Sequence, residues 1–139
     1  MTEKVLTCEN NLVGIWTPDF ERVFQFAESV KKSCADRLKT CMYIHVDQFL
    51  MDLVDHIRTE DGKSQTLLEQ YGRYDVLIIN DVEEFRGKME TQWLLCQLVE
   101  LRRKLNKKTV LIGYRDYKTL FLNGALKTLL DSAENIYEL

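Results

Sequence analysis

The acidic segment from Asn80 to Glu84 is the first place where this sequence could support catalysis, and it reads Asn-Asp-Val-Glu-Glu. It follows an apolar run at residues 75–79 that is typical of a buried strand. A carboxylate at the end of such a strand can bind Mg²⁺ or orient a water molecule. One hypothesis is therefore an enzyme that uses Asp81, Glu83, Glu84 and Arg115. A solvated carboxylate is the simpler interpretation of Asp81, because no phosphate-binding loop accompanies it.

A phosphate-binding loop requires the pattern GxxxxGK[ST], because glycines let backbone N–H groups close on phosphates. After the first apolar run, Leu12–Trp16, the sequence continues Thr-Pro-Asp-Phe-Glu-Arg. This segment has no glycine, its proline lacks an N–H, and its two carboxylates repel phosphate. The tripeptide Gly62-Lys63-Ser64 matches only the end of the motif, since Ile57 stands at the first glycine and no strand precedes it. Dinucleotide GxGxxG and hydrolase GxSxG patterns are also missing from the sequence.

Cysteine and histidine spacing predicts no metal site. No two cysteines form a CxxC pair, and three of the four have apolar neighbours, which favours reduced, buried thiols. The two histidines, His45 and His56, fall in different predicted elements without ligand spacing. The four cysteines are Cys8, Cys34, Cys41 and Cys96.

Short apolar runs alternate with longer runs of helical period, and this pattern positions the residues above. The strands are expected at residues 12–16, 41–46, 75–79, 109–113 and 135–139. Runs that are apolar on both faces are typical of parallel strands covered by helices on both sides. We therefore predict an α/β fold, a five-stranded parallel sheet flanked by helices, in a single domain of residues 1–139. The pattern leaves the strand order open.

The helix after the first strand has the clearest signals. Thr17 is the expected N-cap and Pro18 the first helical residue. An apolar stripe at spacings of three and four predicts the buried face, comprising Phe20, Val23, Phe24, Ala27, Val30, Cys34 and Leu38. Asp47 is expected to cap the next helix, and residues 59–63 form a polar break. A long helix is predicted after Gly87 and Lys88, ending near Leu105.

Composition narrows the class of protein. The chain has 139 residues and a formal net charge of −3, which does not favour duplex nucleic acid as a partner. The basic run Arg102-Arg103-Lys104, with Lys107-Lys108, is interpreted as a solvated helix end, where cations complement the helix dipole, in preference to a nucleic-acid patch. No charge-free stretch approaches the roughly 20 residues of a membrane span, and the start lacks a signal peptide pattern. We expect a cytoplasmic protein without membrane contact.

Two segments carry a family resemblance. Residues 74–92 run from an apolar strand through Asn-Asp to Gly-Lys and a Thr-Gln pair. This order resembles the Walker B region of the bacterial replication initiator family DnaA, an AAA+ (P-loop NTPase-like) family. Residues 43–54 are similar to the second strand of that family and the helix that follows it. The similarity extends more weakly over residues 11–139, and the related regulator Hda is an equally plausible relative.

The resemblance also implies that the nucleotide site is degenerate. The P-loop of the family aligns with residues 15–22, where Glu21 replaces the phosphate-binding lysine, and Trp16 and Phe20 are expected to fill the vacated pocket. Asn80 replaces the first Walker B aspartate, while Asp81 keeps its acid. The sensor-1 Asp-Arg order is reversed at Arg115-Asp116, and no arginine stands in the finger region, Asp131-Ser132-Ala133. We also expect no lid subdomain.

These losses predict an inactive ATPase homologue without a cofactor. The leading hypothesis is a DnaA/Hda-like interaction module in replication initiation, with an initiator, helicase or loader as partner. Its oligomeric state stays open. The alternative is a binder of single-stranded nucleic acid, in which Leu50 and Lys88 match positions of the family's single-strand track. Glu90 and the net negative charge weaken that alternative, and a packed Leu50 with a solvated Lys88 is the simpler interpretation.

Overall fold

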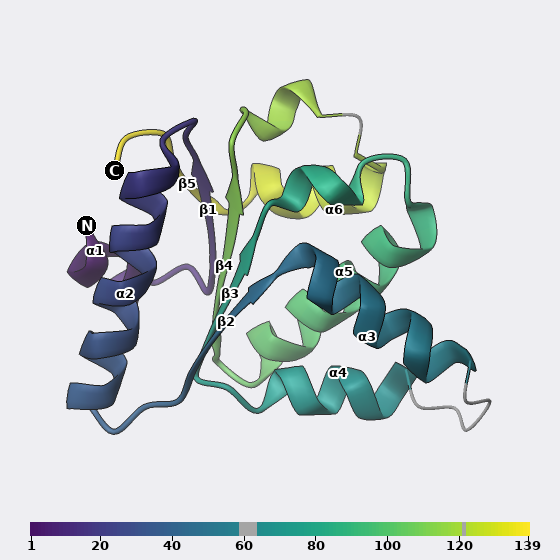
Figure 1. The fold of residues 1–139 in the computed structure, drawn as a ribbon, viewed down its shortest axis with the longest axis horizontal. Coiled ribbons are helices and arrows are strands. Elements are labelled where there is room, and N and C mark those ends of the chain that lie inside the picture. The colour runs from purple at the N-terminus through teal and green to yellow at the C-terminus, as the bar shows by residue number, and fades with distance from the viewer. Residues whose placement is uncertain (59–63, 121) are drawn as a thin grey trace.

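The computed structural model describes residues 1–58, 64–120 and 122–139. Its centre is a parallel sheet of five strands in the order β2-β3-β4-β1-β5 (Figure 1). The prediction of a five-stranded parallel α/β sheet is therefore confirmed, and the strand order is new information. The strands are β1 (Leu12–Trp16), β2 (Cys41–His45), β3 (Val76–Asn80), β4 (Lys108–Gly113) and β5 (Glu134–Ile136).

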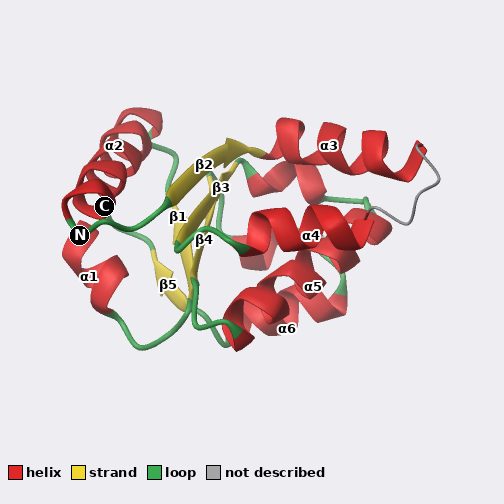
Figure 2. Ribbon diagram, turned by 90° about the horizontal axis from the view of Figure 1, so that it is seen from below, coloured by secondary structure: helices red, strands yellow, loops and turns green. Residues whose placement is uncertain are grey.

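Helices cover both faces of this sheet. Figures 1 and 2 show α1 and α2 on one face and α3 to α6 on the other. The helices are α1 (Thr2–Thr7), α2 (Phe20–Asp36), α3 (Val46–Arg58), α4 (Ser64–Gly72), α5 (Met89–Lys104) and α6 (Gly124–Asp131), with 3₁₀ turns η1 (Val82–Phe85) and η2 (Tyr117–Thr119). In the part of the chain that the structure describes, no helix is long and apolar enough to cross a membrane.

The core consists of two layers separated by the sheet. Because side chains alternate across a strand, Val13 and Ile15 of β1 pack toward α2, whereas Leu12 and Trp16 pack toward α3 to α6. The central strands β1, β3 and β4 are buried along their whole length. This double coverage explains their uninterrupted apolar runs.

The start of α2 differs from the prediction. Asp19, not Thr17, is the N-cap, because the Asp19 carboxylate accepts the Arg22 backbone N–H at 3.1 Å. The hydroxyl of Thr17 instead accepts the Asp19 N–H, at 3.3 Å, in the turn before the helix. At the next helix, α3 begins at Val46 directly after β2, one residue before the expected cap, Asp47.

The predicted apolar stripe of α2 is correct in the middle and wrong at its ends. Phe20 and Phe24 are about two-thirds exposed, and Leu38 is 96% exposed because the helix ends at Asp36 and Leu38 takes a positive φ. Phe26, which was not part of the predicted stripe, is buried instead.

Helix α1 was not predicted. The predicted polar break at 59–63, with Gly62-Lys63 of the partial phosphate motif, and the side chains of Ile57, Ser64 and His56 lie outside the described residues.

Arg102 corrects the interpretation of the basic run as a solvated helix end, because its side chain is completely buried. Its guanidinium donates hydrogen bonds to the Thr109 hydroxyl at 2.8 Å and to the Tyr71 and Lys108 carbonyls, each at 2.7 Å. Burial lowers the pKa of Arg102 to about 10. These bonds join α5 to the end of α4 and the start of β4, so a charged side chain forms the junction of three elements.

Asp75, just before β3, links the start of that strand to the residues that precede β2 and β4. Its carboxylate accepts hydrogen bonds from the Thr40 N–H at 2.8 Å and from the Lys107 ammonium at 2.9 Å. The Thr40 hydroxyl also accepts the Asp75 N–H at 2.9 Å. The hydrogen bond from Lys107, followed by that from Thr40, lowers the pKa of Asp75 to about 2.

We expect Arg102→Lys to destabilise the protein by about 2 to 3 kcal/mol, because an ammonium cannot bond three separated acceptors that the planar guanidinium reaches. Arg103→Lys, one residue further along the same helix, is the matched control and should change stability by less than about 0.5 kcal/mol. Urea unfolding of both variants measures the difference. Equal stability of the two variants would contradict a structural role for the buried guanidinium.

Asp75 should make folding sensitive to acid. A lowered pKa in the folded state means that its stabilisation is complete above the unfolded pKa, near 4, and is lost as the pH falls toward about 2. Thermal melts of Asp75→Asn should therefore change less than those of the wild type over that interval, while the variant is less stable at neutral pH. Glu138→Gln, which removes an exposed carboxylate, is the control for the loss of one acid.

Candidate functional site

The carboxyl edge of the sheet collects six of the predicted site residues, as expected for an open parallel sheet. Asn80 ends β3, Trp16 ends β1, and Asp81 and Arg115 follow β3 and β4. Phe20 and Glu21 open α2 beside them. The two residues of the expected single-strand track, Leu50 and Lys88, lie apart from this edge on α3 and at the start of α5.

The turn from β1 to α2 consists of only three residues, Thr17, Pro18 and Asp19. It is closed by a hydrogen bond from the Thr17 N–H to the Gly113 carbonyl at 3.0 Å. The amino end of α2, where an anion would be stabilised, already bears the Asp19 carboxylate. Glu21 adds a second acid in the first turn; it is exposed and bonds to no residue that the structure describes. This turn lacks the glycine N–H groups that hold a phosphate.

Trp16 is part of the core, with 3% of its surface exposed. Its indole N–H donates to the Asn135 side-chain oxygen at 2.8 Å, and its ring lies 5.1 Å from that of Tyr117. A Cβ atom on Gly14 or on Gly113 would stand 2.7 Å from the indole. The two glycines therefore make room for this side chain on β1 and on the paired strand β4.

A chain of side chains, here termed the tyrosine bridge, crosses the carboxyl edge and consists of Tyr43, Asn80, Tyr114 and Phe20. The Asn80 amide donates to the Tyr43 hydroxyl at 2.7 Å, and the Tyr114 hydroxyl donates to the Asn80 oxygen at 2.8 Å. Phe20 stacks on Tyr114, with ring centroids 4.2 Å apart. Phe20 is 67% exposed, so it covers the bridge from outside and is not buried as expected.

Burial sets the electrostatics of the bridge. It raises the pKa of both Tyr43 and Tyr114, so these hydroxyls stay protonated and neutral at physiological pH. The Lys31 ammonium lies 5.3 Å from the centroid of the Tyr43 ring. The amide of Asn80, itself 7% exposed, thus bonds two neutral hydroxyls and offers no negative charge to a cation.

Glu83 closes the neighbouring loop. One carboxylate oxygen accepts the backbone N–H groups of Tyr114 and of Arg115, the latter at 2.9 Å. Burial, with the nearby Asp81 carboxyl, raises the pKa of Glu83, whereas these N–H bonds lower it. The two backbone donors after β4 are therefore occupied by a carboxylate of the chain itself. Arg115 takes part through its backbone N–H. Its side chain is exposed and bonds to no residue that the structure describes.

Asp81 is the partly accessible acid of this edge. Its backbone is left-handed, with φ 67°, and its carboxylate lies 3.4 Å from Nε2 of His45. Nδ1 of His45 accepts the Asp47 N–H at 3.2 Å and also lies 3.4 Å from the Asp47 carboxylate, so the imidazole stands between two acids. Among the described residues, no group of three or more His, Cys, Asp or Glu is arranged to hold a metal ion.

The two residues of the single-strand track have different environments. Leu50 is half-buried and packs against the core. Lys88 is exposed, and its ammonium lies 3.9 Å from the Glu84 carboxylate. Glu90, also exposed, follows in the first turn of α5. The positive charge at Lys88 is therefore flanked by two acids.

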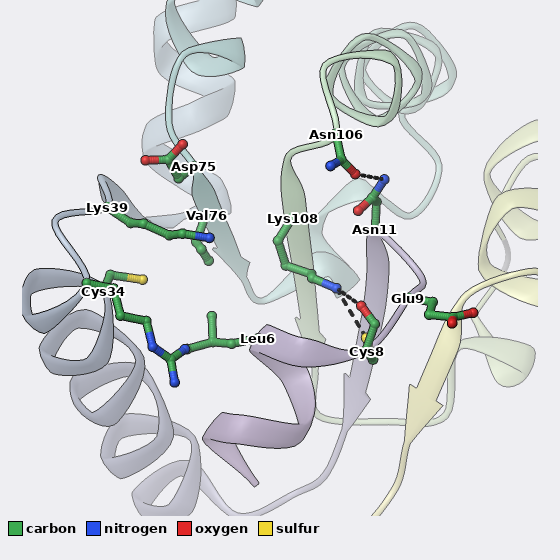
Figure 3. Close-up of a pocket in the computed structure, with 11 residues that line it drawn as sticks. Leu6, Cys8, Glu9, Asn11, Cys34, Lys39, Asp75, Val76, Asn106 and Lys108 are labelled. Carbon is green, nitrogen blue, oxygen red and sulfur yellow. Dashed lines mark hydrogen bonds between the residues drawn. The ribbon is translucent and has the colours of Figure 1, made fainter.

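A cavity of about 280 Å³ lies at the opposite, amino edge of the sheet (Figure 3). Within it, the Lys108 ammonium donates to the Cys8 and Asn10 carbonyls at 2.7 and 2.6 Å, and Arg37 pairs with Glu3. These cations are already engaged by the chain. The cavity also meets Cys34, whose thiol has a pKa raised by burial. All four cysteines are free.

Three further residues belong to the carboxyl edge, namely Tyr43, Tyr114 and Glu83. The sequence analysis assigned no role to the two tyrosines. Tyrosine is common in and after strands, so its identity carries little information. Only the register of β2, β3 and β4 brings both hydroxyls to Asn80. One usable signal was a polar amide, Asn80, at the end of a buried apolar strand.

Residues 25–132 match the family model of the bacterial DnaA ATPase domain. The chromosomal replication initiator protein DnaA of Chlorobaculum tepidum is 30% identical over 79 residues, which are 57% of this chain and 16% of that protein. Domain III of the Thermotoga maritima replication initiation protein DnaA superposes with a TM-score of 0.88 at 19% identity, covering 99% of this chain and 59% of that one.

A replication initiator DnaA bound to AMPPCP and single-stranded DNA superposes with a TM-score of 0.85 at 19% identity, over 99% of this chain and 43% of that one. The chain thus spans less than two thirds of each of these relatives. At such identity the two structures establish the shared fold, and the family match rests on sequence.

We expect Asn80→Leu to cost about 2 kcal/mol of stability, because it leaves two half-buried tyrosine hydroxyls without their partner. The matched triple variant Tyr43→Phe, Asn80→Leu, Tyr114→Phe removes both sides of each bond and should recover most of that loss. Chemical unfolding of the two variants tests the bridge. A triple variant less stable than Asn80→Leu would mean that the hydroxyls are stabilised by other groups.

Proposed function

The chain belongs to the bacterial DnaA ATPase-domain family, and from this premise we propose that it is a non-catalytic, initiator-like interaction module. Its role is in the initiation of DNA replication or in the regulation of that step, through contacts with other replication proteins. The observation that carries the proposal is the tyrosine bridge, since it places the chain's own side chains across the edge where open α/β sheets bind ligands.

Nucleotide binding requires donors for phosphate, and this edge has few that are not already used. The amino end of α2 is capped by Asp19, and the N–H groups of Tyr114 and Arg115 bond Glu83. The three-residue turn after β1 is also too short for a glycine-rich loop. We therefore propose that ATP and ADP do not bind here.

Magnesium coordination is weakened for a related reason. A bound Mg²⁺ needs several oxygen ligands and usually the phosphates of the nucleotide. Asn80 directs its amide to Tyr43 and Tyr114, and the Asp81 carboxylate lies 3.4 Å from Nε2 of His45. Asp81 and the neighbouring Glu83 are the acids at this point, and one Glu83 oxygen is held by two backbone N–H groups. Without a phosphate partner, this pair is a poor site for metal binding or phosphoryl transfer.

Without nucleotide chemistry, recognition by the surface is the function that remains. Members of an AAA+ assembly pack against one another, so a copy without a nucleotide fits a role as a cap or an adaptor. We propose an initiator, a replicative helicase or its loader as the partner. Binding of single-stranded DNA ranks second: the fold matches an initiator bound to single-stranded DNA, but Glu84 and Glu90 flank the one cation, Lys88, that was assigned to that track.

Calorimetry and thermal melts with Mg-ATP and Mg-ADP test the proposal. We expect no heat and no shift in melting temperature at protein concentrations of about 100 µM, where even weak ligands in the micromolar range are detected. A ligand at a hundred times its Kd would add about 2.7 kcal/mol of stability, so a clear rise in melting temperature would contradict it.

A nucleotide-binding initiator domain serves as the positive control for these measurements. A fluorescence titration of labelled single-stranded DNA at low and high salt distinguishes the second candidate. Salt-sensitive binding that is lost in Lys88→Glu would favour the single-strand function over the interaction module.

A further inference from the structure

Helix α5 exposes large apolar side chains that the fold does not use. Trp93 is 56% exposed and Met89, one turn earlier, is 63% exposed. Both lie on the face of α5 that points away from the sheet, because Leu94, Leu95 and Leu98 supply the buried face. A tryptophan so accessible is unusual for a side chain without a contact role.

The surface around Trp93 is hollowed. Helix α5 lies between α4 and α6 (Figure 2) and contacts both. A groove of about 430 Å³ runs along it, with Leu68 of α4 on one side and Ala125 of α6 on the other. Leu101 and Cys96 of α5 form its apolar floor, and Glu100 and Lys104 contribute charged groups. The groove is wide enough to receive an aromatic side chain.

The exposed stripe of α5 is self-complementary. It comprises Glu90, Trp93, Gln97, Leu101 and Lys104, whose spacings of three and four place them on one side of the helix. All are exposed except Leu101, which is half-buried and packs against the core. Around Gln97 the stripe is symmetric, with the two apolar residues four positions away and the two opposite charges seven positions away. Neither Glu90 nor Lys104 bonds to any residue that the structure describes.

We propose that this face binds a second copy of the chain, with the two α5 helices antiparallel about a two-fold axis at Gln97. In that arrangement each Trp93 lies beside Leu101 of the other copy and enters its groove. Each Glu90 stands level with Lys104 of the other copy, so two ion pairs flank the apolar centre. Two-fold symmetry requires a patch complementary to itself, which this stripe is in both apolar character and charge.

An unrelated partner explains the stripe less well. A groove for a foreign helix needs apolar character and some charge, but it does not need the two opposite charges and the two apolar groups to be symmetric around one residue. The proposed dimer lies on the helix layer α4 to α6, and it does not depend on nucleotide or on the proposed replication role. It therefore stands or fails independently of the proposed function.

Sedimentation velocity over a range of protein concentrations tests the dimer. The wild-type chain, with a mass of 16.4 kDa, should sediment as a concentration-dependent dimer. Trp93→Glu should weaken dimerisation by about tenfold or more, since a buried aromatic anchor is a typical hot spot. Phe24→Glu replaces a similarly exposed aromatic on α2, across the sheet, and is the matched control expected to dimerise normally.

Charge reversal makes the test specific to a second copy in this register. Glu90→Lys and Lys104→Glu should each weaken the dimer, and more so at low salt, because each places like charges opposite one another. The double variant Glu90→Lys, Lys104→Glu restores both pairs and should dimerise like the wild type. A foreign partner gives no reason for this rescue.

Tryptophan fluorescence supplies a second readout. The chain has two tryptophans, and Trp16 is already buried in the monomer, so a blue shift with rising concentration reports Trp93. A chain that stays monomeric at the highest concentration, or a dimer unaffected by Trp93→Glu and by both charge reversals, would overturn the proposal. Folding of each variant is checked by its cooperative unfolding.

Discussion

The buried guanidinium of Arg102 is the interaction on which the arrangement of the helix layer depends. A charge removed from water is tolerated only when its hydrogen bonds are satisfied, and here Thr109, Tyr71 and Lys108 supply the acceptors. Because the fork of the guanidinium is rigid, these contacts fix where α5 crosses the ends of α4 and β4. The position of α5 in turn forms the groove between α4 and α6. The groove on the outer side of the helix layer therefore depends on the buried Arg102 junction beneath it.

The two edges of the sheet are built by different means. At the amino edge, Asp75 and Arg102 use charged hydrogen bonds, and Lys107 and Lys108 also have acceptors within the chain. At the carboxyl edge, the bridge through Asn80 is neutral, because burial keeps both tyrosines protonated. In a nucleotide-binding relative of this fold, a bound ligand would stabilise that edge through linkage. Here the Asn80 amide and the two tyrosine hydroxyls bond one another, whereas Oε2 of Glu83 is buried without a hydrogen-bond partner among the described residues.

The sheet could be predicted because parallel strands covered on both faces are mostly apolar, as residues 76–79 and 110–112 are. The order of the strands could not be predicted, because it depends on how the connecting segments place β4 between β1 and β3. Arg102 was misjudged because three adjacent bases look like a solvated helix end, and only tertiary contact shows that one points inward. Phe20 was expected to be buried, yet a start at Asp19 turns it outward onto Tyr114. The glycines at 14 and 113, in strands otherwise filled with large residues, were a readable sign of the bulky indole beside them.

The core and the polar groups of the carboxyl edge are formed largely by different residues. The two core layers and the Arg102 junction do not include Asn80 or Glu21, so the architecture does not depend on these two positions. The tyrosine hydroxyls at this edge are satisfied together with the Asn80 amide, which donates to one and accepts from the other. An aspartate at position 80 would have no N–H to donate to the Tyr43 hydroxyl, and it would place a charge between the two hydroxyls. A change at position 80 alone would therefore disrupt the bridge, because its members form one hydrogen-bonded unit.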